Sequence, residues 1–261
     1  MAVLETFSLK GKVALATGGA GLYGRQIVTA LAEAGAVTWT ASRNIQALER
    51  FVEPLRSRGL DARAARFDQG DERSVRELRD RILGESGRVD VLVNNAVLRP
   101  MAKGYSDDAA RFAESMAVNG TGLFVVTRAF GDAMAERKAG SIINIGSIQG
   151  MIGTDPTIYR GTNMSGWYPD YFFHKGGMIN FTRFVASYYG RFGVRCNCVS
   201  PGGLRTEKHP EAFVRQYSDR TFLGRLAGET DLMGSIVFLA SDASLYVTGT
   251  NLPVDGGYTA K

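Results

Sequence analysis

Cysteine and histidine are scarce in this sequence, which contains two of each. Cys196 and Cys198 are separated by a single residue, while His174 and His209 stand apart from each other. Neither pair has the ligand spacing of a zinc site, and two cysteines do not make a disulfide framework. We therefore expect no metal site. Buried thiols in a reducing compartment are the better interpretation, which favours a cytoplasmic location.

Long apolar runs are also missing from the chain. None approaches the roughly 18 residues that a membrane-spanning helix needs. The N-terminal stretch MAVLETFSLKGK lacks the charged and then apolar pattern of a signal peptide. The sequence therefore predicts no membrane partner.

Charge of one sign is not concentrated anywhere. Lys and Arg total 31 against 26 Asp and Glu, a net charge of +5, but the basic residues are scattered. No nucleic-acid partner is expected, because proteins that bind nucleic acids usually gather Lys and Arg on one face or helix. A basic mouth that attracts an anionic cofactor or substrate explains the small excess equally well.

What the sequence does contain is a regular alternation of segments typical of strands and of helices. Short apolar runs are followed by segments in which apolar residues recur at helical spacing. This pattern predicts one α/β domain over residues 1–261, a Rossmann-like, doubly wound parallel sheet of about seven strands with helices on both faces. The expected strands are Lys12–Thr17, Val37–Ala41, Ala62–Phe67, Val89–Val93, Ser141–Ile145, Val194–Val199 and Asn251–Val254. The expected helices lie around residues 27–34 and at Ile45–Arg58, Glu72–Leu83, Asp107–Lys138, Tyr171–Phe192, Glu211–Phe222 and Asp231–Ser241.

A glycine-rich turn, Thr17–Gly24 (TGGAGLYG), lies where the first expected strand passes into the first helix. Glycines there let the backbone turn tightly and approach a pyrophosphate, which the N-terminus of the following helix stabilises. A Walker-type phosphate loop is excluded, because no Gly-Lys-Ser or Gly-Lys-Thr follows. The turn therefore predicts a dinucleotide site near the beginning of the chain.

Tyr171 and Lys175 are four residues apart at the start of an expected helix, so their side chains share one face. An isolated Tyr ionises near pH ~10 and is a poor base at neutrality. A nearby ammonium favours the phenolate and lowers the pKa of the phenol towards the range of a general acid or base. Taken alone, the pair also fits an ordinary surface helix with a half-buried Tyr.

After the glycine-rich turn, several motifs occur along the chain in a fixed order, and the Tyr171–Lys175 pair is one of them. They are Asp68 after the third expected strand, Asn94-Asn95-Ala96 after the fourth, Asn119 in the long helix, Ser147 after the fifth strand, Tyr171 with Lys175, Pro201-Gly202 after the sixth strand, and Val254–Gly257 near the end. With the glycine-rich turn, they make nearly the whole chain resemble the short-chain dehydrogenases/reductases. Two positions depart from the family pattern, since Leu22 and Val97 each stand where Gly is usual. The resemblance implies hydride transfer between a nicotinamide and a carbon that bears a hydroxyl or a carbonyl.

The same resemblance implies four catalytic residues. Tyr171 would exchange the proton of the substrate hydroxyl, and Lys175 would lower the pKa of Tyr171 and hold the nicotinamide ribose. Ser147 would hydrogen-bond the reacting oxygen and stabilise the charge that develops on it. Asn119 would position a water molecule that links Lys175 to solvent. Ser147 would also lie at the carboxyl end of a strand, where parallel α/β sheets bind ligands.

The cofactor contacts are implied in the same way. Ser42 and Arg43 follow the second expected strand, where an acidic residue would favour NAD and an Arg favours the 2′-phosphate of NADP. We therefore expect NADP. NAD stays open, because the glycine-rich turn lacks the second basic residue of many NADP users. The expected cofactor-binding residues are Gly18, Gly21, Leu22, Tyr23, Gly24, Ser42, Arg43, Asp68, Gln69, Asn95, Ala96, Lys175, Pro201, Gly202 and Thr206.

The stretch between Ser147 and Tyr171 is longer than is usual in the family. Its part at about 150–170 is expected to form a substrate loop, with a subunit contact as the alternative, and residues of about 204–222 a lid. Aromatic, amide and guanidinium groups there suit a polyhydroxylated ring better than a lipid chain, and the basic residues would admit an anionic group. The expected substrate-binding residues are Arg99, Gln149, Tyr159, Thr162, Trp167, Gly203 and Arg205.

These features predict an NAD(P)-dependent oxidoreductase that interconverts a secondary alcohol and a ketone, or a lactol and a lactone. The expected substrate is a sugar, a sugar acid or a polyol. The alternative is a reductase of 3-oxoacyl or other small carbonyl compounds. A catalytically silent dinucleotide-binding sensor or scaffold is a further alternative, although such proteins generally lose the Tyr or the Lys. Because family members mostly form tetramers, a homotetramer is expected.

Overall fold

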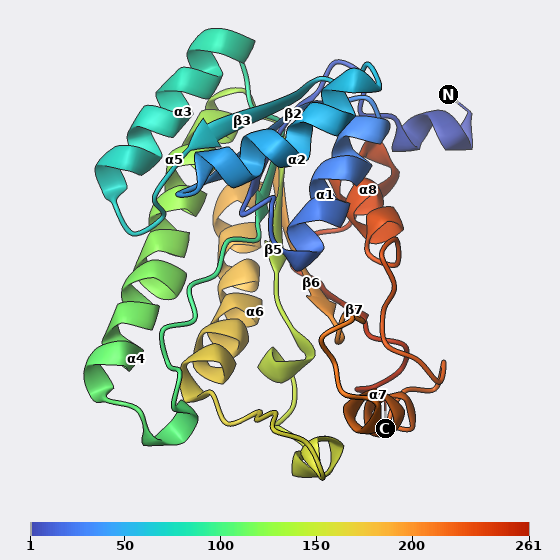
Figure 1. The fold of residues 1–261 in the computed structure, drawn as a ribbon. Helices are drawn as coiled ribbons and strands as arrows, with labels where there is room; N and C mark the ends of the chain where they lie inside the picture. The colour runs from blue at the N-terminus through green and yellow to red at the C-terminus, as the bar shows by residue number, and fades with distance from the viewer. Residues whose placement is uncertain (1, 261) are drawn as a thin grey trace.

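Seven strands form one parallel sheet (Figure 1) in the computed structural model, which describes residues 2–260. They are β1 (Val13–Thr17), β2 (Val37–Ser42), β3 (Ala62–Arg66), β4 (Val91–Asn94), β5 (Gly140–Ile145), β6 (Val194–Pro201) and β7 (Asn251–Val254). Their order across the sheet is β3-β2-β1-β4-β5-β6-β7. All neighbouring strands are parallel, so their carboxyl ends meet at one edge. The strand order reverses between β1 and β4, and ligands bind at such a point in open α/β sheets.

Helices cover both faces of the sheet (Figure 1). They are α1 (Leu22–Glu33), α2 (Ile45–Ser57), α3 (Glu72–Ser86), α4 (Ala109–Met116), α5 (Leu123–Glu136), α6 (Pro169–Gly190), α7 (Glu211–Ser218) and α8 (Met233–Ala240). Ala14 and Ala16 of β1 face α1, α2 and α8, whereas Val13 and Leu15 face α3, α5 and α6. Because both faces are covered, β1 is buried along its whole length. The predicted doubly wound α/β fold is therefore confirmed.

The long helix predicted at Asp107–Lys138 is interrupted. A π-helical stretch, Ala117–Gly122, separates α4 from α5, and Asn119 is buried within it. The widened turn passes close to the chain that follows β3, since a Cβ on Gly122 would lie 2.3 Å from the carbonyl oxygen of Gln69. Such local π-helical turns are frequent at functional sites. Here the turn directs Asn119 towards the segment that follows β4.

The segment after β5 and the segment around α7 pack together beyond the carboxyl edge of the sheet. Short 3-10 turns form at Ile148–Gly150 and Pro156–Tyr159, and α7 ends at Ser218, short of the predicted boundary. In Figure 1, α7 lies beside the C-terminus at the lower end of the molecule. The buried members of this third apolar cluster are Ile148, Ile158, Phe213, Tyr217, Leu226 and Tyr258.

Both cysteines lie on β6, where they are buried and form no disulfide. Burial raises the pKa of the Cys198 thiol. The thiols are thus packed in the sheet, as the sequence predicted. Among residues 2–260, every helix is too short or too polar to cross a membrane. The remaining 3-10 turns are Val3–Phe7, Gly104–Ser106 and Asp242–Ser244.

Candidate active site

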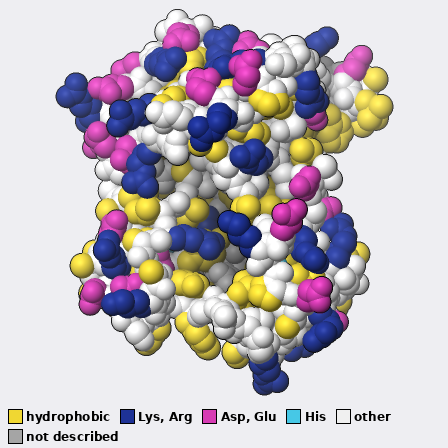
Figure 2. All heavy atoms as spheres, in the orientation of Figure 1, with side chains coloured by type: hydrophobic (Ala, Val, Ile, Leu, Met, Phe, Trp, Pro, Cys, Tyr) yellow, Lys and Arg dark blue, Asp and Glu magenta, His cyan; other side chains and the backbone are white. Residues whose placement is uncertain are grey.

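A cleft of about 780 Å³ opens along the carboxyl edge of the sheet. Figure 2 shows the hollow in the middle of one face, with Lys and Arg side chains at its rim. Its walls come from segments far apart in the sequence: the glycine-rich turn, the ends of β2 to β6, the segment after β5, the start of α6 and α7. The cleft therefore lies where the strand order predicts a ligand site.

The glycine-rich turn leaves little room for side chains at Gly18, Gly19 and Gly24. Gly18 has φ +71°, and a Cβ there would lie 3.0 Å from the Cα of Ala96. A Cβ on Gly24 would lie 2.2 Å from the carbonyl oxygen of Gly18. Asn95 donates from Nδ2 to the carbonyl oxygens of Thr17 at 2.9 Å and Gly18 at 3.1 Å, which holds the turn against β4. The N-terminus of α1 thus opens on the cleft with bare backbone around it, an arrangement that fits a pyrophosphate.

The far end of the cleft, beyond β2 and β3, carries the groups expected at the adenosine end of a dinucleotide. Ser42 and Arg43 both line it, and the Arg43 side chain is exposed to solvent. Asp68 also lines it, with Oδ1 accepting from the backbone N–H of Gly70 at 2.9 Å. Gln69 reaches it too, while its Nε2 donates to the carbonyl oxygen of Val118 at 2.9 Å. A guanidinium and a hydroxyl side by side suit a phosphate monoester.

Tyr171 and Lys175 project from the first turns of α6 into the cleft, as their spacing predicted. Pro169 at the first position of α6 and Asp170 next to it favour the start of a helix at this point. The ammonium of Lys175 lies 5.6 Å from the Tyr171 ring centroid and donates to the carbonyl oxygen of Ile145. Lys175 is buried, so its charge acts on the phenol through little water.

Burial by itself would raise the pKa of Tyr171, but three neighbours outweigh it. The charges of Lys175 and Arg99, with hydrogen bonds to Ser147 and Arg99, hold the pKa of Tyr171 below its ordinary value. Burial likewise lowers the pKa of Lys175. A phenol whose ionised form is stabilised in this way is a better general acid and base than an ordinary tyrosine.

Ser147 stands at the end of β5, beside Tyr171. Its backbone is extended, and its Oγ accepts a hydrogen bond from the backbone N–H of Gln149 at 3.1 Å. Because Oγ accepts that bond, the Ser147 hydroxyl proton can be donated to the Tyr171 oxygen or to an oxygen of a ligand in the cleft. Tyr171 and Ser147 together therefore present two hydroxyl groups to one point.

Asn119 does not line the cleft. Its side chain accepts from the backbone N–H of Leu98 at 2.9 Å and donates to the Leu98 carbonyl oxygen at 2.7 Å. Its Nδ2 also donates to Ser115 Oγ, which in turn donates to Asp170 Oδ2 at 2.6 Å. This buried chain joins the segment after β4 to the start of α6. The Ser115–Asp170 link has no signal in the sequence, because the two residues are 55 positions apart.

Two further basic side chains surround Tyr171. The guanidinium of Arg99 lies 4.0 Å from the ring centroid, over its face. The ring of His174 meets the Tyr171 ring edge-on at 5.2 Å and 87°, and it is buried without a hydrogen-bond partner among the described residues. Burial, aided by the charges of Lys175 and Arg99, lowers the pKa of His174 to about 3. His174 therefore stays neutral beside the phenol.

The other expected residues divide into two groups. Gly21, Leu22, Ala96, Pro201, Gly202, Gln149, Tyr159 and Gly203 line the cleft. Thr162, Trp167, Arg205 and Thr206 do not. Thr162 closes a turn by donating from Oγ1 to the carbonyl oxygen of Tyr159, and Trp167 and Arg205 are exposed.

Aromatic residues complete the wall, and sequence reasoning named Tyr23 among them but missed Phe213 and Tyr217. Tyr23 donates to the carbonyl oxygen of Gly202 at 2.8 Å, a contact across the cleft. Tyr217 accepts from the backbone N–H of Gly203 at 2.6 Å, and Phe213 stacks on Tyr159 with centroids 5.7 Å apart. The spacing of Phe213 and Tyr217 on one face of α7 is the signal that could have found them. Tyr168, Met164 and His209 line the cleft as well.

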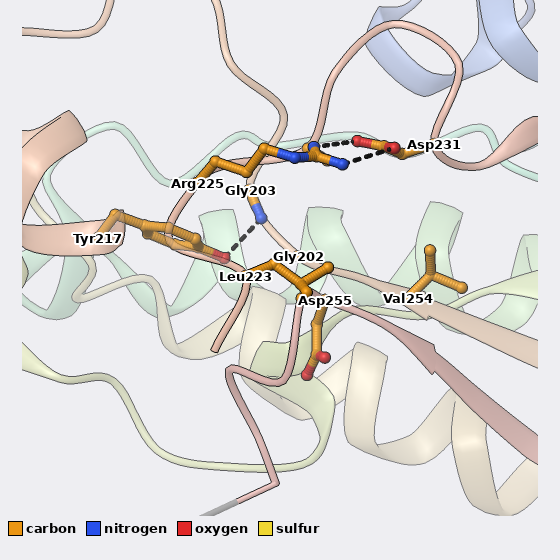
Figure 3. Close-up of a pocket in the computed structure, with 10 residues that line it drawn as sticks. Gly202, Gly203, Tyr217, Leu223, Arg225, Asp231, Val254 and Asp255 are labelled. Atoms are coloured by element: carbon orange, nitrogen blue, oxygen red, sulfur yellow. Dashed lines mark hydrogen bonds and ion pairs between the residues drawn. The ribbon is translucent and has the colours of Figure 1, made fainter. Parts of the chain in front are cut away.

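A smaller cavity of about 110 Å³ lies behind the Gly202–Gly203 backbone. Figure 3 shows Tyr217 reaching the Gly203 nitrogen there, with Arg225 paired to Asp231 on the other side. The carboxylate of Asp255 accepts from the backbone N–H groups of Gly257 and Thr259, both at 2.9 Å. The polar groups of this cavity thus satisfy one another, and they support the backbone that forms the floor of the larger cleft.

Known proteins and a family model match almost the whole length of this chain. A family model described as enoyl-(acyl carrier protein) reductase matches residues 21–259. Galactitol 2-dehydrogenase (L-tagatose-forming) of Cereibacter sphaeroides is 34% identical over 261 residues, which cover 97% of this chain and 97% of that protein. The 5-keto-D-gluconate 5-reductase of Escherichia coli (strain K12) is 33% identical over 259 residues, again 97% of each chain.

Solved structures are similar to the same extent. A gluconate 5-dehydrogenase from Burkholderia cenocepacia, in complex with NADP and tartrate, superimposes with a TM-score of 0.87 at 31% identity and covers 99% of each chain. An NAD⁺-bound xylitol dehydrogenase superimposes with a TM-score of 0.85 at 26% identity, covering 95% of this chain and 99% of that one. Proteins with this fold thus bind NADP in one case and NAD⁺ in the other.

Proposed function

This chain belongs to the short-chain dehydrogenase/reductase family, and we propose that it oxidises or reduces a sugar, sugar acid or polyol with NADP as its preferred cofactor. Family membership makes it an NAD(P)-dependent oxidoreductase that interconverts alcohols and ketones, which confirms the predicted reaction class. The observation that carries the sugar proposal is the lining of the cleft. Around the hydroxyls of Ser147 and Tyr171 it places the polar or aromatic side chains of Gln149, Tyr159 and Tyr168.

Ser147 and Tyr171 act together on the reacting oxygen. When bound, the nicotinamide ring accepts or supplies the hydride. Tyr171 removes the hydroxyl proton as the alcohol is oxidised, or donates it as the ketone is reduced. Ser147 donates a hydrogen bond to the same oxygen while charge develops on it, and such a preorganised donor is commonly worth about 3 kcal/mol of barrier.

Lys175 and Asn119 support this proton transfer in different ways. Lys175 stabilises the Tyr171 phenolate, and its position in the cleft suits a contact with the nicotinamide ribose. Asn119 has its side chain committed to Leu98 and Ser115. We therefore propose that Asn119 contributes by holding the π-helical stretch against the segment after β4. A water molecule next to Lys175 would then be bound by backbone groups, because the Asn119 side chain is already bonded elsewhere.

The preference for NADP rests on Ser42 and Arg43. The residues at the end of β2 include no Asp or Glu, whose carboxylate would repel the 2′-phosphate of NADP. The test is kcat/KM for NADP and for NAD in wild type and Arg43→Gln. We expect wild type to favour NADP and the variant to lose about tenfold with NADP but little with NAD, since only one of them carries the phosphate. Equal losses with both cofactors would contradict the assignment.

The substrate proposal is tested by turnover on a panel. The panel contains aldonates, alditols, aldoses and short 3-oxoacyl thioesters, with the absorbance of the reduced nicotinamide as the readout. We expect turnover with hydroxylated substrates and little with thioesters, because Gln149, Tyr159 and Tyr168 offer hydrogen-bond partners to substrate hydroxyl groups near Ser147 and Tyr171. Thioester turnover above sugar turnover would favour the reductase alternative. Cofactor binding without any turnover would favour a silent sensor. The presence of Ser147, Tyr171 and Lys175 counts against that alternative.

The remaining assignments concern the organisation of the chain. We propose one dinucleotide-binding domain, with residues 150–170 as a substrate loop and 204–222 as a lid. Support comes from the ion pair of Asp155 with Arg220 at 2.8 Å and from the stacking of Tyr159 on Phe213, which join loop and lid. This intramolecular packing favours the substrate loop over the subunit contact.

We further propose a cytoplasmic homotetramer. Exposed aromatic side chains on α5 and α6 support an assembly, since Phe124, Phe184 and Tyr188 are each at least two-fifths exposed. Phe184 stacks on Tyr188 with ring centroids 6.2 Å apart, so these two side chains form a contiguous apolar patch. Light scattering of the purified protein tests the tetramer, and a monomeric mass would contradict it.

A further inference from the structure

We propose that Arg99 selects substrates that carry a carboxylate, or a comparable oxyanion, on the reacting carbon or on the carbon next to it. This inference rests on the proposed function and deepens it, because it places the anionic group relative to the reaction. The predicted substrate class is thus a 2- or 3-hydroxy acid of a polyol or sugar, and its oxo counterpart.

The position of Arg99 over Tyr171 carries the inference. The guanidinium lies 4.0 Å from the ring centroid, on the residue that exchanges a proton with the reacting oxygen. The reacting oxygen must come within hydrogen-bond distance of the phenol, roughly 2.7 Å. A group that pairs with Arg99 at the same time is therefore only a few ångströms from the reacting carbon. Arg99 presents planar, bidentate donors, which match a carboxylate better than a hydroxyl.

Charge in the cleft favours an anion at this place. Among the described residues that line the cleft, Asp68 is the only acidic one. It follows β3, three strands away from β4, after which Arg99 comes. At the usual spacing between strands this is roughly 14 Å. The substrate end of the cleft thus holds the cations Arg99 and Lys175 with no carboxylate beside them, so an anionic substrate would supply the missing partner.

The backbone of Arg99 is held on both sides, as a selective residue requires. Asn119 clamps the preceding Leu98 through both its N–H and its carbonyl oxygen, at 2.9 and 2.7 Å. Pro100 follows directly, and a residue before proline is restricted to extended backbone. The backbone that carries the guanidinium is therefore fixed before any substrate arrives, which reduces the entropy lost on binding.

The experiment measures binding, so it does not depend on turnover. Tartrate and threitol share a four-carbon skeleton and two inner hydroxyls, but only tartrate carries carboxylates. Their affinities for the NADP-loaded enzyme are measured by calorimetry in wild type, Arg99→Gln and Arg50→Gln. Arg50 is the matched control, because it is an exposed Arg on α2 that does not line the cleft.

We expect Arg99→Gln to weaken tartrate binding by about 10- to 100-fold and threitol binding by less than about threefold. Arg50→Gln should leave both affinities nearly unchanged. The proposal is overturned if wild type fails to bind tartrate, if Arg99→Gln weakens both ligands equally or neither, or if Arg50→Gln has the same effect. Selective tartrate binding without turnover of any sugar derivative would reject the proposed function and leave the role of Arg99 standing.

Discussion

The two ends of the cleft are built in different ways. The dinucleotide end is made by backbone, since Gly18 and Gly24 leave space that no side chain can share. The substrate end is made by side chains from distant segments, such as Tyr159 stacked on Phe213 and Asp155 paired with Arg220. The first arrangement has little freedom to vary, whereas the second can be altered one side chain at a time. We therefore expect mutations to be severe at the first end and graded at the second, with the catalytic residues between them.

The largest effect is expected from Tyr171→Phe, which removes the proton carrier between the two ends. Loss of a general acid/base should lower kcat by about 10²- to 10⁴-fold. The affinity for NADP should stay within about twofold, because the dinucleotide end is untouched. Steady-state kinetics and cofactor titration check both, and a kcat close to that of wild type would refute the proposed mechanism.

Gly24→Ala tests whether the dinucleotide end tolerates any side chain. The added Cβ would lie 2.2 Å from the Gly18 carbonyl oxygen, so the turn must shift. We expect a loss of about 2 kcal/mol or more of stability and at least a tenfold weaker affinity for NADP.

Gly84→Ala is the matched control for this change. Gly84 lies within α3, and a Cβ there meets nothing within 4 Å. Because alanine is a better helix former than glycine, Gly84→Ala should raise the free energy of unfolding by about 0.5–1 kcal/mol. Urea unfolding and cofactor titration measure both variants. Equal stability changes for the two would show that the turn is not rigid.

His174 links the catalytic residues to the stability of the fold. Burial lowers its pKa to about 3, against an unfolded value of 6.5. The unfolded state therefore binds more protons between these values, and the stabilisation present above pH 6.5 is lost as the pH falls towards 3. In His174→Phe, which keeps a ring edge-on to Tyr171, this part of the pH dependence should disappear.

The size of the His174 effect can be measured directly. Between pH 6.5 and pH 4, the free energy of unfolding of wild type should fall by roughly 3 kcal/mol more than that of His174→Phe, since each pH unit contributes up to about 1.36 kcal/mol. Urea unfolding at a series of pH values gives the difference. Parallel curves for the two proteins would mean that His174 is protonated in the folded state or has partners in solution.

The smallest effect is expected from Asp155→Asn at the substrate end. The ion pair with Arg220 is partly exposed, so its loss should cost at most about 1 kcal/mol. KM for the substrate should rise about two- to fivefold as loop and lid loosen, with the affinity for NADP unchanged. A larger effect on NADP than on substrate would remove the distinction between the two ends.

Local patterns predicted most of the dinucleotide end. The glycine-rich turn, the residues after β2 and the four-residue spacing of Tyr171 and Lys175 all act over short stretches of chain. The structure places these groups in one cleft, as expected. The substrate end was harder to predict, because Thr162 and Trp167 were chosen by residue type within the long loop after β5, and Arg205 within the segment after β6. Their positions depend on how that loop folds back on α7, and sequence spacing does not report it.

The sequence by itself determined the alternation of strands and helices and the proton-transfer pair, because periodicity and i to i+4 spacing follow from backbone geometry alone. Only the tertiary structure decided that Arg99 lies over Tyr171, that Asn119 clamps Leu98 and that Ser115 bonds Asp170. These contacts join residues tens of positions apart, so they exist only once the sheet has brought β4, the π-helical turn and α6 together. Packing that joins separate elements therefore decides which side chains meet the substrate.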